Sequence, residues 1–135
     1  MPNSRPDMAE IISAVRECLQ EQILPVCNEP ALNLNVRICM SLLATVVREL
    51  DRGAALAELE HHLLCDVLAE LQVSARSDLE QKDNYQLNQV LTDLLENVPN
   101  AATDRRIMDA LYQITLSRLE IDNPKYPALK AAKPA

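Results

Sequence analysis

Residues 34–53 read LNVRICMSLLATVVRELDRG, and this segment predicts a helical fold. At about 100° per residue, most of its apolar side chains fall on one wide arc of a helix. The arc consists of Val36, Ile38, Cys39, Met40, Leu42, Leu43, Val46, Val47 and Leu50. The remaining face is narrow and carries Arg37, Ser41, Thr45 and Arg48. A helix this apolar is predicted to lie at the centre of an all-helical fold.

Gly53 is the only glycine in the chain and follows this segment directly. Glycine commonly ends a helix, so Gly53 is predicted to stop the central helix at about Arg52. A further helical stripe then runs over about residues 54–73, with Leu56, Leu59, Leu63, Val67 and Leu71 at helical spacing. So short a joint predicts an antiparallel hairpin of two helices that meet at Gly53.

Three more helices are predicted on either side of that hairpin. The first begins at an Asp7 cap, with Glu10 three residues on, and ends at Pro25. The others cover about 84–98 and, after a Thr103 cap, 103–122. Residues 25–33 and 74–83 are polar or proline-containing and read as loops, although Ser77 and Glu80 could start a helix early.

Together these segments predict the fold class and its boundaries. The class is all-α, a single-domain bundle of about five antiparallel helices over residues 1–129. An extended segment is expected from residue 123, because Pro124 and Pro127 restrict the backbone there. Residues 130–135, rich in Ala, Lys and Pro, are expected to form a disordered tail.

Composition narrows the classes of function. One glycine among 135 residues argues against the phosphate-cradling loops of nucleotide enzymes. The net charge is −7, from 20 acidic and 13 basic residues, which disfavours nucleic acid and anionic membrane surfaces as partners. No signal-peptide pattern opens the sequence, so a cytoplasmic location is expected.

The residues that most often carry chemistry are not arranged for it. His61 and His62 are adjacent, so on a helix they point about 100° apart and cannot chelate one metal together. The cysteines have no metal-knuckle spacing and are interpreted as small core residues: Cys18, Cys27, Cys39 and Cys65. No Ser-His-Asp or Cys-His grouping is evident. We therefore expect no catalytic residue, no metal site and no cofactor in this chain.

The last predicted helix has two apolar ridges, where a peripheral helix needs one. The second ridge is Met108, Tyr112, Leu116 and Leu119. This helix could be sandwiched between neighbours, or the ridge could bind another protein. The polar segment that follows is also a candidate for partner binding: Asp122, Asn123, Pro124, Lys125, Tyr126 and Pro127.

Arg37 and Arg48 share the narrow polar face of the central helix. They could pair with Glu49 or Asp51 at the surface, where such pairs contribute little to stability. Alternatively, they could bind carboxylates of a partner or a ligand phosphate. Both arginines are therefore kept as candidate partner-binding residues.

Several segments, in order, resemble a small bacterial family of domains of unknown function. They are Ala14-Val15-Arg16-Glu17, Ile23-Leu24-Pro25, Val36-Arg37, Val47-Arg48-Glu49-Leu50, and Arg118-Leu119-Glu120-Ile121-Asp122-Asn123-Pro124-Lys125-Tyr126. Members of that family accompany aminoglycoside-phosphotransferase-like kinases and acyl-CoA dehydrogenases. The resemblance is closest to accessory subunits of levulinate-type 4-hydroxyacyl-CoA kinases.

The resemblance implies a non-catalytic subunit of a kinase complex in hydroxy or keto acid catabolism. The phosphotransferase-like kinase would be the partner, and acyl-CoA would be met only through the complex. Two alternatives stay open. One is a self-associating helical domain, a homodimer with a scaffolding role. The other is a small ligand-binding bundle with a pocket among its helices.

Overall fold

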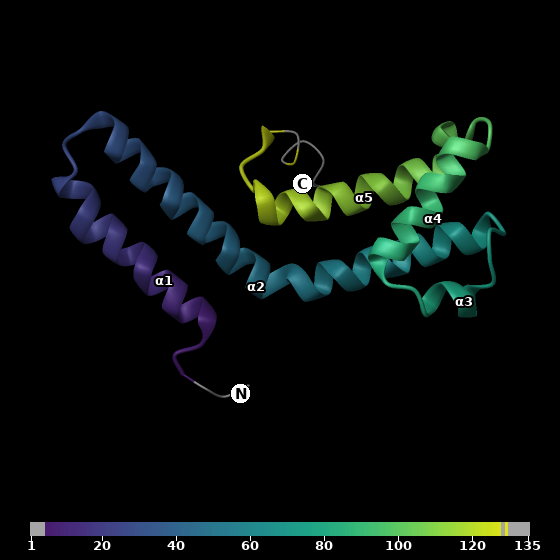
Figure 1. Ribbon diagram of the computed structural model, residues 1–135, viewed down its shortest axis with the longest axis horizontal. Coiled ribbons are helices and arrows are strands. Elements are labelled where there is room, and N and C mark those ends of the chain that lie inside the picture. Colours follow the sequence, from purple (N-terminus) through teal and green to yellow (C-terminus); the bar gives the residue numbers. More distant parts are fainter. Residues whose placement is uncertain (1–4, 128, 130–135) are drawn as a thin grey trace. The chain divides into compact units, whose positions relative to one another are not determined.

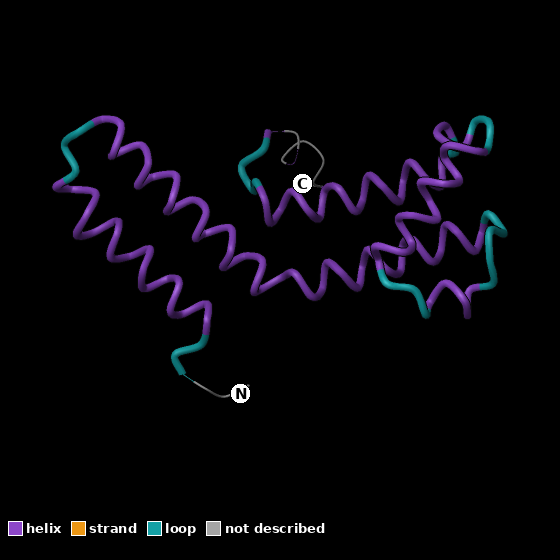
Figure 2. The backbone as a smooth tube through the Cα atoms, in the orientation of Figure 1, coloured by secondary structure: helices purple, strands orange, loops and turns teal. Residues whose placement is uncertain are grey.

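The computed structural model describes residues 5–127 and 129, and its regular elements there are all helical (Figures 1 and 2). The predicted all-α class with five α-helices is confirmed. The elements are α1 (Met8–Cys18), a π turn η1 (Leu19–Ile23), 3-10 turn η2 (Leu24–Val26), α2 (Pro30–Glu70), α3 (Arg76–Glu80), α4 (Asn84–Asn97), 3-10 turn η3 (Ala101–Thr103) and α5 (Arg105–Asp122).

Contacts along the chain group into two units, each described by itself below. The first unit comprises Met1–Gly53 with Ile121–Asn123, and the second comprises Ala54–Glu120 with Pro124–Ala135. The predicted boundaries of a single domain at 1 and 129 stay a prediction. The expected disordered tail, 130–135, lies outside the described residues.

The predicted helical hairpin at Gly53 is wrong, because α2 runs through that glycine without interruption. Gly53 has no positive φ, so it does not act as a helix terminator. One interior glycine costs about 1 kcal/mol relative to alanine, which the hydrogen bonds of a long helix outweigh. The helix also begins earlier than expected, with Pro30 as its first residue, a position where the missing N–H is harmless.

The first unit is a hairpin of α1 and the initial part of α2, which run side by side in opposite directions (Figure 1). The Nε of Arg16 donates to the carbonyl of Met40 at 3.2 Å across the hairpin. At the connection, the side-chain amide of Asn33 donates to the carbonyl of Cys27 at 3.3 Å. None of the described residues 5–53 is buried, and the buried residue of this unit is Ile121, which is 1% exposed.

The second unit has a core formed by the rest of α2 with α3, α4, η3 and α5. Its most completely buried side chains are Leu64, Leu68, Leu79, Leu87 and Ile107. The short helix α3 lies where a loop with a possible early helix start was expected. Helix α4 begins with a capping box, in which Asp83 Oδ1 accepts from the N–H of Gln86 at 2.8 Å.

The predicted Thr103 cap of α5 is wrong by one residue. Asp104 Oδ1 accepts from the N–H of Arg106 at 2.9 Å at the start of the helix. Thr103 belongs to η3, and its hydroxyl donates to the carbonyl of Asn100 at 2.9 Å. Because Asn100 has φ of 67°, the chain turns tightly after Pro99 and uses Thr103 within that turn.

Candidate partner-binding surfaces

The apolar arc of α2 in the first unit is divided between two environments. Val36, Met40, Leu43 and Val47 are half-buried, and they lie close together on one side of the helix. Ile38, Leu42, Val46 and Leu50 recur every four residues and are 42–61% exposed. The prediction that this whole arc forms the centre of the fold is therefore wrong for its exposed half.

Helix α1 contributes to the same exposed surface. Ile12 and Leu19 are half-buried, whereas Ile11 and Val15 are each 49% exposed. Viewed from its own N-terminus, each helix has its contact with the other helix at one angle around its axis. In an antiparallel pair, residues that are displaced from that contact in the same rotational direction lie on the same side of the pair. By helical periodicity, Ile11 and Val15 of α1 are displaced in the same direction as Val46 of α2. We call these residues the hairpin face: Ile11, Val15, Ile38, Leu42, Val46 and Leu50.

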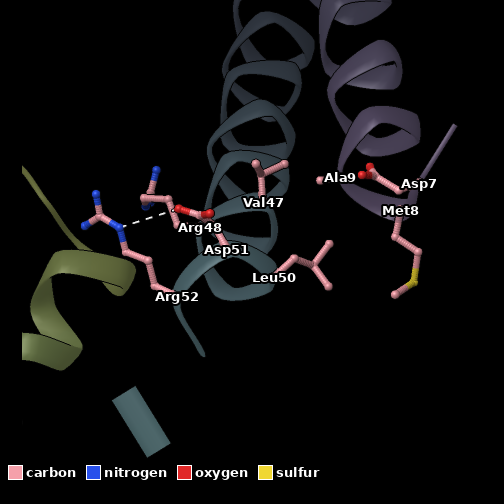
Figure 3. Close-up of a pocket in the computed structure, with 8 residues that line it drawn as sticks. All are labelled: Asp7, Met8, Ala9, Val47, Arg48, Leu50, Asp51 and Arg52. Carbon is pink, nitrogen blue, oxygen red and sulfur yellow. Dashed lines mark ion pairs between the residues drawn. The ribbon is translucent and has the colours of Figure 1, made fainter. Parts of the chain in front are cut away.

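The open end of the hairpin is hollowed. A pocket of about 480 Å³ lies between the start of α1 and α2 (Figure 3). Its lining residues are Asp7, Met8, Ala9, Val47, Arg48, Leu50, Asp51 and Arg52. The charged side chains of the pocket include an ion pair in which Arg52 Nε lies 3.8 Å from Asp51 Oδ2. The lining combines apolar side chains with two carboxylates and two guanidinium groups, a combination that a binding surface can use.

The predicted second ridge of α5 is only partly accessible. Met108 and Tyr112 are 54% and 58% exposed, whereas Leu116 and Leu119 are half-buried. The exposed part of the ridge is therefore confined to the first half of the helix. This leaves a smaller apolar patch than sequence periodicity indicated.

The predicted segment after α5 is exposed throughout, from Asp122 to Pro127. Its expected extended path is interrupted by a turn at Pro124 and Lys125, because the fixed φ of proline fits the first corner of a turn. Tyr126 is 44% exposed, and its carbonyl accepts from the N–H of Leu129 at 3.0 Å. The segment offers polar and aromatic groups, but little continuous apolar area.

The two candidate arginines already have partners within the first unit. Arg48 Nε donates to the carbonyl of Ile121 at 2.7 Å, and its Nη2 donates to Thr45 Oγ1 at 3.0 Å. Arg37 Nε donates to Asn33 Oδ1 at 2.9 Å. Arg48 therefore ties the residues after Glu120 to α2, a structural role that sequence periodicity did not indicate.

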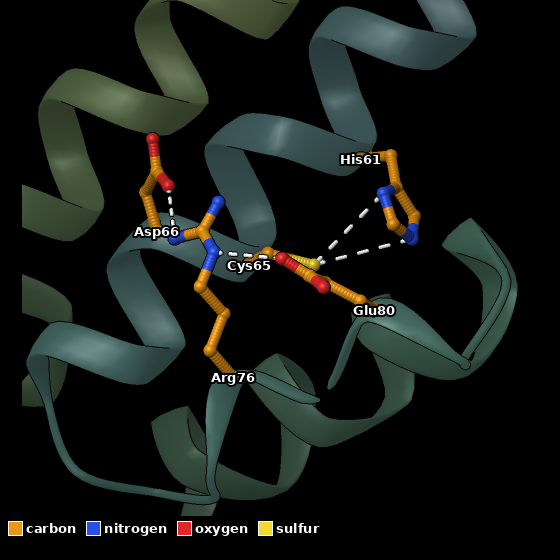
Figure 4. Close-up of polar contacts among 5 residues, drawn as sticks. All are labelled: His61, Cys65, Asp66, Arg76 and Glu80. Carbon is orange, nitrogen blue, oxygen red and sulfur yellow. Dashed lines mark hydrogen bonds and ion pairs between the residues drawn. The ribbon is translucent and has the colours of Figure 1, made fainter. Parts of the chain in front are cut away.

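The second unit holds a polar cluster around Cys65 (Figure 4). Arg76 forms ion pairs with Asp66 and with Glu80, and these hydrogen bonds raise the pKa of Arg76. His61 Nε2 lies 3.0 Å from the carbonyl of Lys82, and both of its ring nitrogens lie 3.9 Å from Cys65 Sγ.

Burial decides the chemistry of this cluster. Desolvation raises the pKa of the Cys65 thiol, although the nearby Arg76 partly opposes it. A protonated, buried thiol is a poor nucleophile. Beside this thiol, the ion pair of Arg76 with Asp66 connects α3 to α2. Within the described residues, no group of three or more His, Cys, Asp or Glu side chains is placed to hold a metal ion.

Helix α2 is long enough and apolar enough to cross a membrane. An 18-residue window has a mean hydropathy of 1.4, and none of that window is buried. Soluble core helices and signal sequences satisfy the same criterion. The expectation of a protein partner rather than a membrane therefore stays a prediction, and so does the cytoplasmic location.

The hairpin face is a candidate surface that sequence reasoning missed. The signal was present in the width of the arc on α2, which is greater than one neighbouring helix can cover. From sequence alone, the same width predicts a central core helix. Only the structure shows that α1 covers one part of the arc and that the rest is in solvent.

Comparison with known proteins gives one match. Residues 28–126 match a family described as Domain of unknown function (DUF6285). The matched range includes all of α2 to α5 and begins after α1. No curated protein and no solved structure matches significantly.

Proposed function

Because the chain belongs to the DUF6285 family, whose own function is undefined, we propose its role from its surfaces and its sequence resemblance. We propose that it is a non-catalytic accessory subunit that binds and supports an aminoglycoside-phosphotransferase-like 4-hydroxyacyl-CoA kinase in levulinate-type catabolism. The binding role is supported by exposed apolar side chains. The choice of kinase rests on the sequence resemblance described above.

The observation that carries the proposal is the lack of buried side chains in residues 5–53. Apolar surface gains about 25 cal/mol for each Å² removed from water. Contiguous exposed apolar patches on soluble proteins commonly mark protein-binding sites. The hairpin face has six exposed apolar side chains, whereas the α5 ridge has two.

The chemistry of phosphoryl transfer indicates which groups the kinase would supply and which role is left to this chain. That reaction needs a phosphate cradle, metal-binding carboxylates and a positioned base. The kinase would supply these groups, and the acyl-CoA would bind through the complex. The present chain would act by binding the competent state of the kinase more tightly than other states, which raises the population of that state.

The test is co-expression with an aminoglycoside-phosphotransferase-like kinase from the same organism. We expect the two proteins to co-purify, and we expect phosphorylation of a 4-hydroxyacyl-CoA to fall when this chain is omitted. A kinase that is fully active alone and does not co-purify would refute the proposal. Unchanged co-purification of the Met108→Ser/Tyr112→Ser variant would exclude the α5 ridge as the contact surface.

The alternative is a self-associating scaffold, and the same hairpin face favours it. Two hairpins could pair their apolar faces to form a four-helix arrangement. Light scattering on the isolated chain distinguishes the two functions. A stable dimer that persists when the kinase is present would favour the scaffold.

A further inference from the structure

We infer that Arg48 and Ile121 form a conformational latch, through which the last turn of α5 and the hairpin of α1 and α2 open and close together. The latch lies within the first unit, which comprises residues 1–53 and Ile121–Asn123. The inference goes beyond the proposed function, because it concerns an equilibrium within the chain and holds for any partner that the chain binds.

The polar half of the latch is a side-chain cap on the last turn of α5. The last four carbonyls of a helix have no N–H partner within that helix, and Ile121 is the residue before the end of α5. Arg48 Nε donates to the carbonyl of Ile121 at 2.7 Å, across 73 positions of sequence. The guanidinium also lies at the negative end of the helix dipole, where a cation is favourable.

A second set of hydrogen bonds orients Arg48. Its Nη2 donates to Thr45 Oγ1 at 3.0 Å, and that hydroxyl donates to the carbonyl of Ser41 at 3.1 Å. Arg48 is half-buried, so water competes less for these hydrogen bonds than it does at an exposed site. The guanidinium is therefore held at one position along α2, where it can cap a helix end.

The apolar half of the latch is the side chain of Ile121. It is 1% exposed, whereas none of the described residues 5–53 is buried. The most enclosed side chain among the described residues of the first unit thus comes from the far end of the sequence. Because most helical stability in proteins comes from packing, the closed hairpin should depend on this side chain.

The two halves link the opening of the hairpin to the release of the last turn of α5. Release of this turn would expose Ile121 to water and leave its carbonyl without the Arg48 donor. Separation of α1 from α2 would expose half-buried side chains such as Ile12 and Val47. If both events disturb the same unit, linkage requires that each of them favours the other.

The residues that follow the latch are accessible to a partner. We call Asp122–Pro127 the exit segment, and every residue in it is exposed. Pro124 cannot continue the helix, so a partner bound to the exit segment would act on the last turn of α5. Such binding would shift the hairpin between closed and open states without contacting it.

The first experiment measures hydrogen exchange of the full chain by mass spectrometry. Arg48→Met removes the donor and keeps an unbranched apolar stem. We expect exchange to become about tenfold faster over residues 8–23 and over residues 119–127. Arg37→Met is the matched control, because Arg37 donates to Asn33 within its own helix at 2.9 Å. The control should leave both regions unchanged.

Three results of this experiment would overturn the inference. Unchanged exchange over residues 119–127 in Arg48→Met would mean that the cap is absent in solution. Faster exchange over 119–127 alone would mean that the cap does not act on the hairpin. An equal increase around Leu87, in the core of the second unit, would indicate a general loss of stability instead of a latch.

A second pair of variants tests the apolar half. Ile121→Ala should make exchange over residues 8–23 about tenfold faster. Ile114→Ala is the control, because Ile114 packs against the core of the second unit from the same helix, and it should leave 8–23 unchanged. If circular dichroism shows loss of helix in Ile121→Ala, Ile121→Val is used, with an expected increase of about threefold. Unchanged exchange over 8–23 would overturn the inference.

The reciprocal test starts from the hairpin. Ile12→Ala should make exchange over residues 119–127 faster, although Ile12 lies near the opposite end of the sequence. In the Arg48→Met background, the same substitution should have no further effect on 119–127. Equal effects of Ile12→Ala with and without Arg48 would show that the two residues act independently, which would overturn the inference.

Arg48→Lys distinguishes the cap from simple packing of the side chain. Lysine can donate to the carbonyl of Ile121 but lacks the planar fork that also bonds to Thr45. Exchange over residues 119–127 should therefore be slower in Arg48→Lys than in Arg48→Met. Exchange that is faster in the lysine variant would overturn the inference.

These measurements use the isolated chain, so the inference and the proposed function fail separately. Coupled exchange in a chain that binds no kinase would refute the kinase role and keep the latch. Uncoupled exchange in a chain that forms the kinase complex would refute the latch and keep the kinase role.

Discussion

The two parts of α2 have similar apolar character but very different surroundings. After Gly53, the helix has five buried side chains: Leu56, Leu64, Cys65, Val67 and Leu68. Before Gly53 it has no buried side chain, although Ile38, Leu42 and Val46 are as apolar as the residues of a core. A hydrophobic pattern shows which side chains favour burial. It does not show whether the same chain supplies the surface that covers them.

The strongest test of this contrast compares one leucine from each part of α2. Leu68 is 0% exposed and Leu42 is 61% exposed. Leu68→Ala should lower the free energy of unfolding by about 2–5 kcal/mol, because it removes packed methyl groups and leaves a cavity. Leu42→Ala should change it by less than about 0.5 kcal/mol. Urea denaturation of the isolated chain measures both, and equal losses would mean that Leu42 is packed in solution.

Removing a helix cap from each unit should have an effect of intermediate size on the free energy of unfolding. Asp83 caps α4 in the packed unit, and Asp7 Oδ1 accepts from the N–H of Glu10 at 2.8 Å to cap α1. Asp83→Ala should lower the free energy of unfolding by about 1 kcal/mol.

The Asp7→Ala substitution should act locally, because α1 has no core behind it. Hydrogen exchange should become faster in α1 and stay unchanged in α4. Faster exchange in both helices would indicate that the two units unfold cooperatively.

Substitution of Gly53 should have a smaller effect on stability, and it should raise stability where the substitutions above lower it. It lies inside α2 with no positive φ, so alanine should be the better residue there. An added Cβ would approach the flexible Glu49 side chain, with its Oε1 at 2.9 Å, and that side chain can move. We expect Gly53→Ala to stabilise the protein by about 0.5–1 kcal/mol in thermal denaturation. Destabilisation would show that the helix is interrupted at Gly53 in solution.

The smallest expected effect is a pH dependence of stability, and it arises from Cys65 in the second unit. Burial raises the pKa of Cys65 above its ordinary value of 9.0, so the folded state holds the thiol proton more tightly than the unfolded state does. The resulting stability is fully present below pH 9.0 and is lost as the pH rises through the folded-state pKa. Unfolding measured from neutral to alkaline pH should show a decline that becomes shallower in Cys65→Ala. An identical slope in that variant would assign the decline to other groups.

Much of the fold could be predicted from periodicity. The stretches around Ile11, Leu64, Leu91 and Ile107 have apolar residues at helical spacing and lie in helices as expected. Gly53 misled the prediction because glycine favours a helix end only where the backbone needs positive φ. The sequence around it, Glu49 to Ala55, contains no proline or other strong helix breaker and stays helical.

The candidate binding surfaces were harder to predict because exposure depends on the neighbours of each side chain. Met108 and Leu116 have the same periodicity on α5, yet the first is exposed and the second is half-buried. Arg48 was expected at a free surface, but its partner is the carbonyl of Ile121, 73 residues away in sequence. Periodicity along one helix contains no information about contacts at such separations.

The π turn of residues Leu19–Ile23 affects how the chain tolerates changes in length. Its bonding is wider than that of an α-helix, with the N–H of Leu24 donating to the carbonyl of Leu19. The turn therefore accommodates one residue beyond the number that regular α-helix would need. A deletion of Gln20 should convert it to an α turn, keep Met8–Cys18 in register and leave the circular dichroism spectrum nearly unchanged. The end of the first helix is thus a place where this protein can lose a residue without losing its architecture.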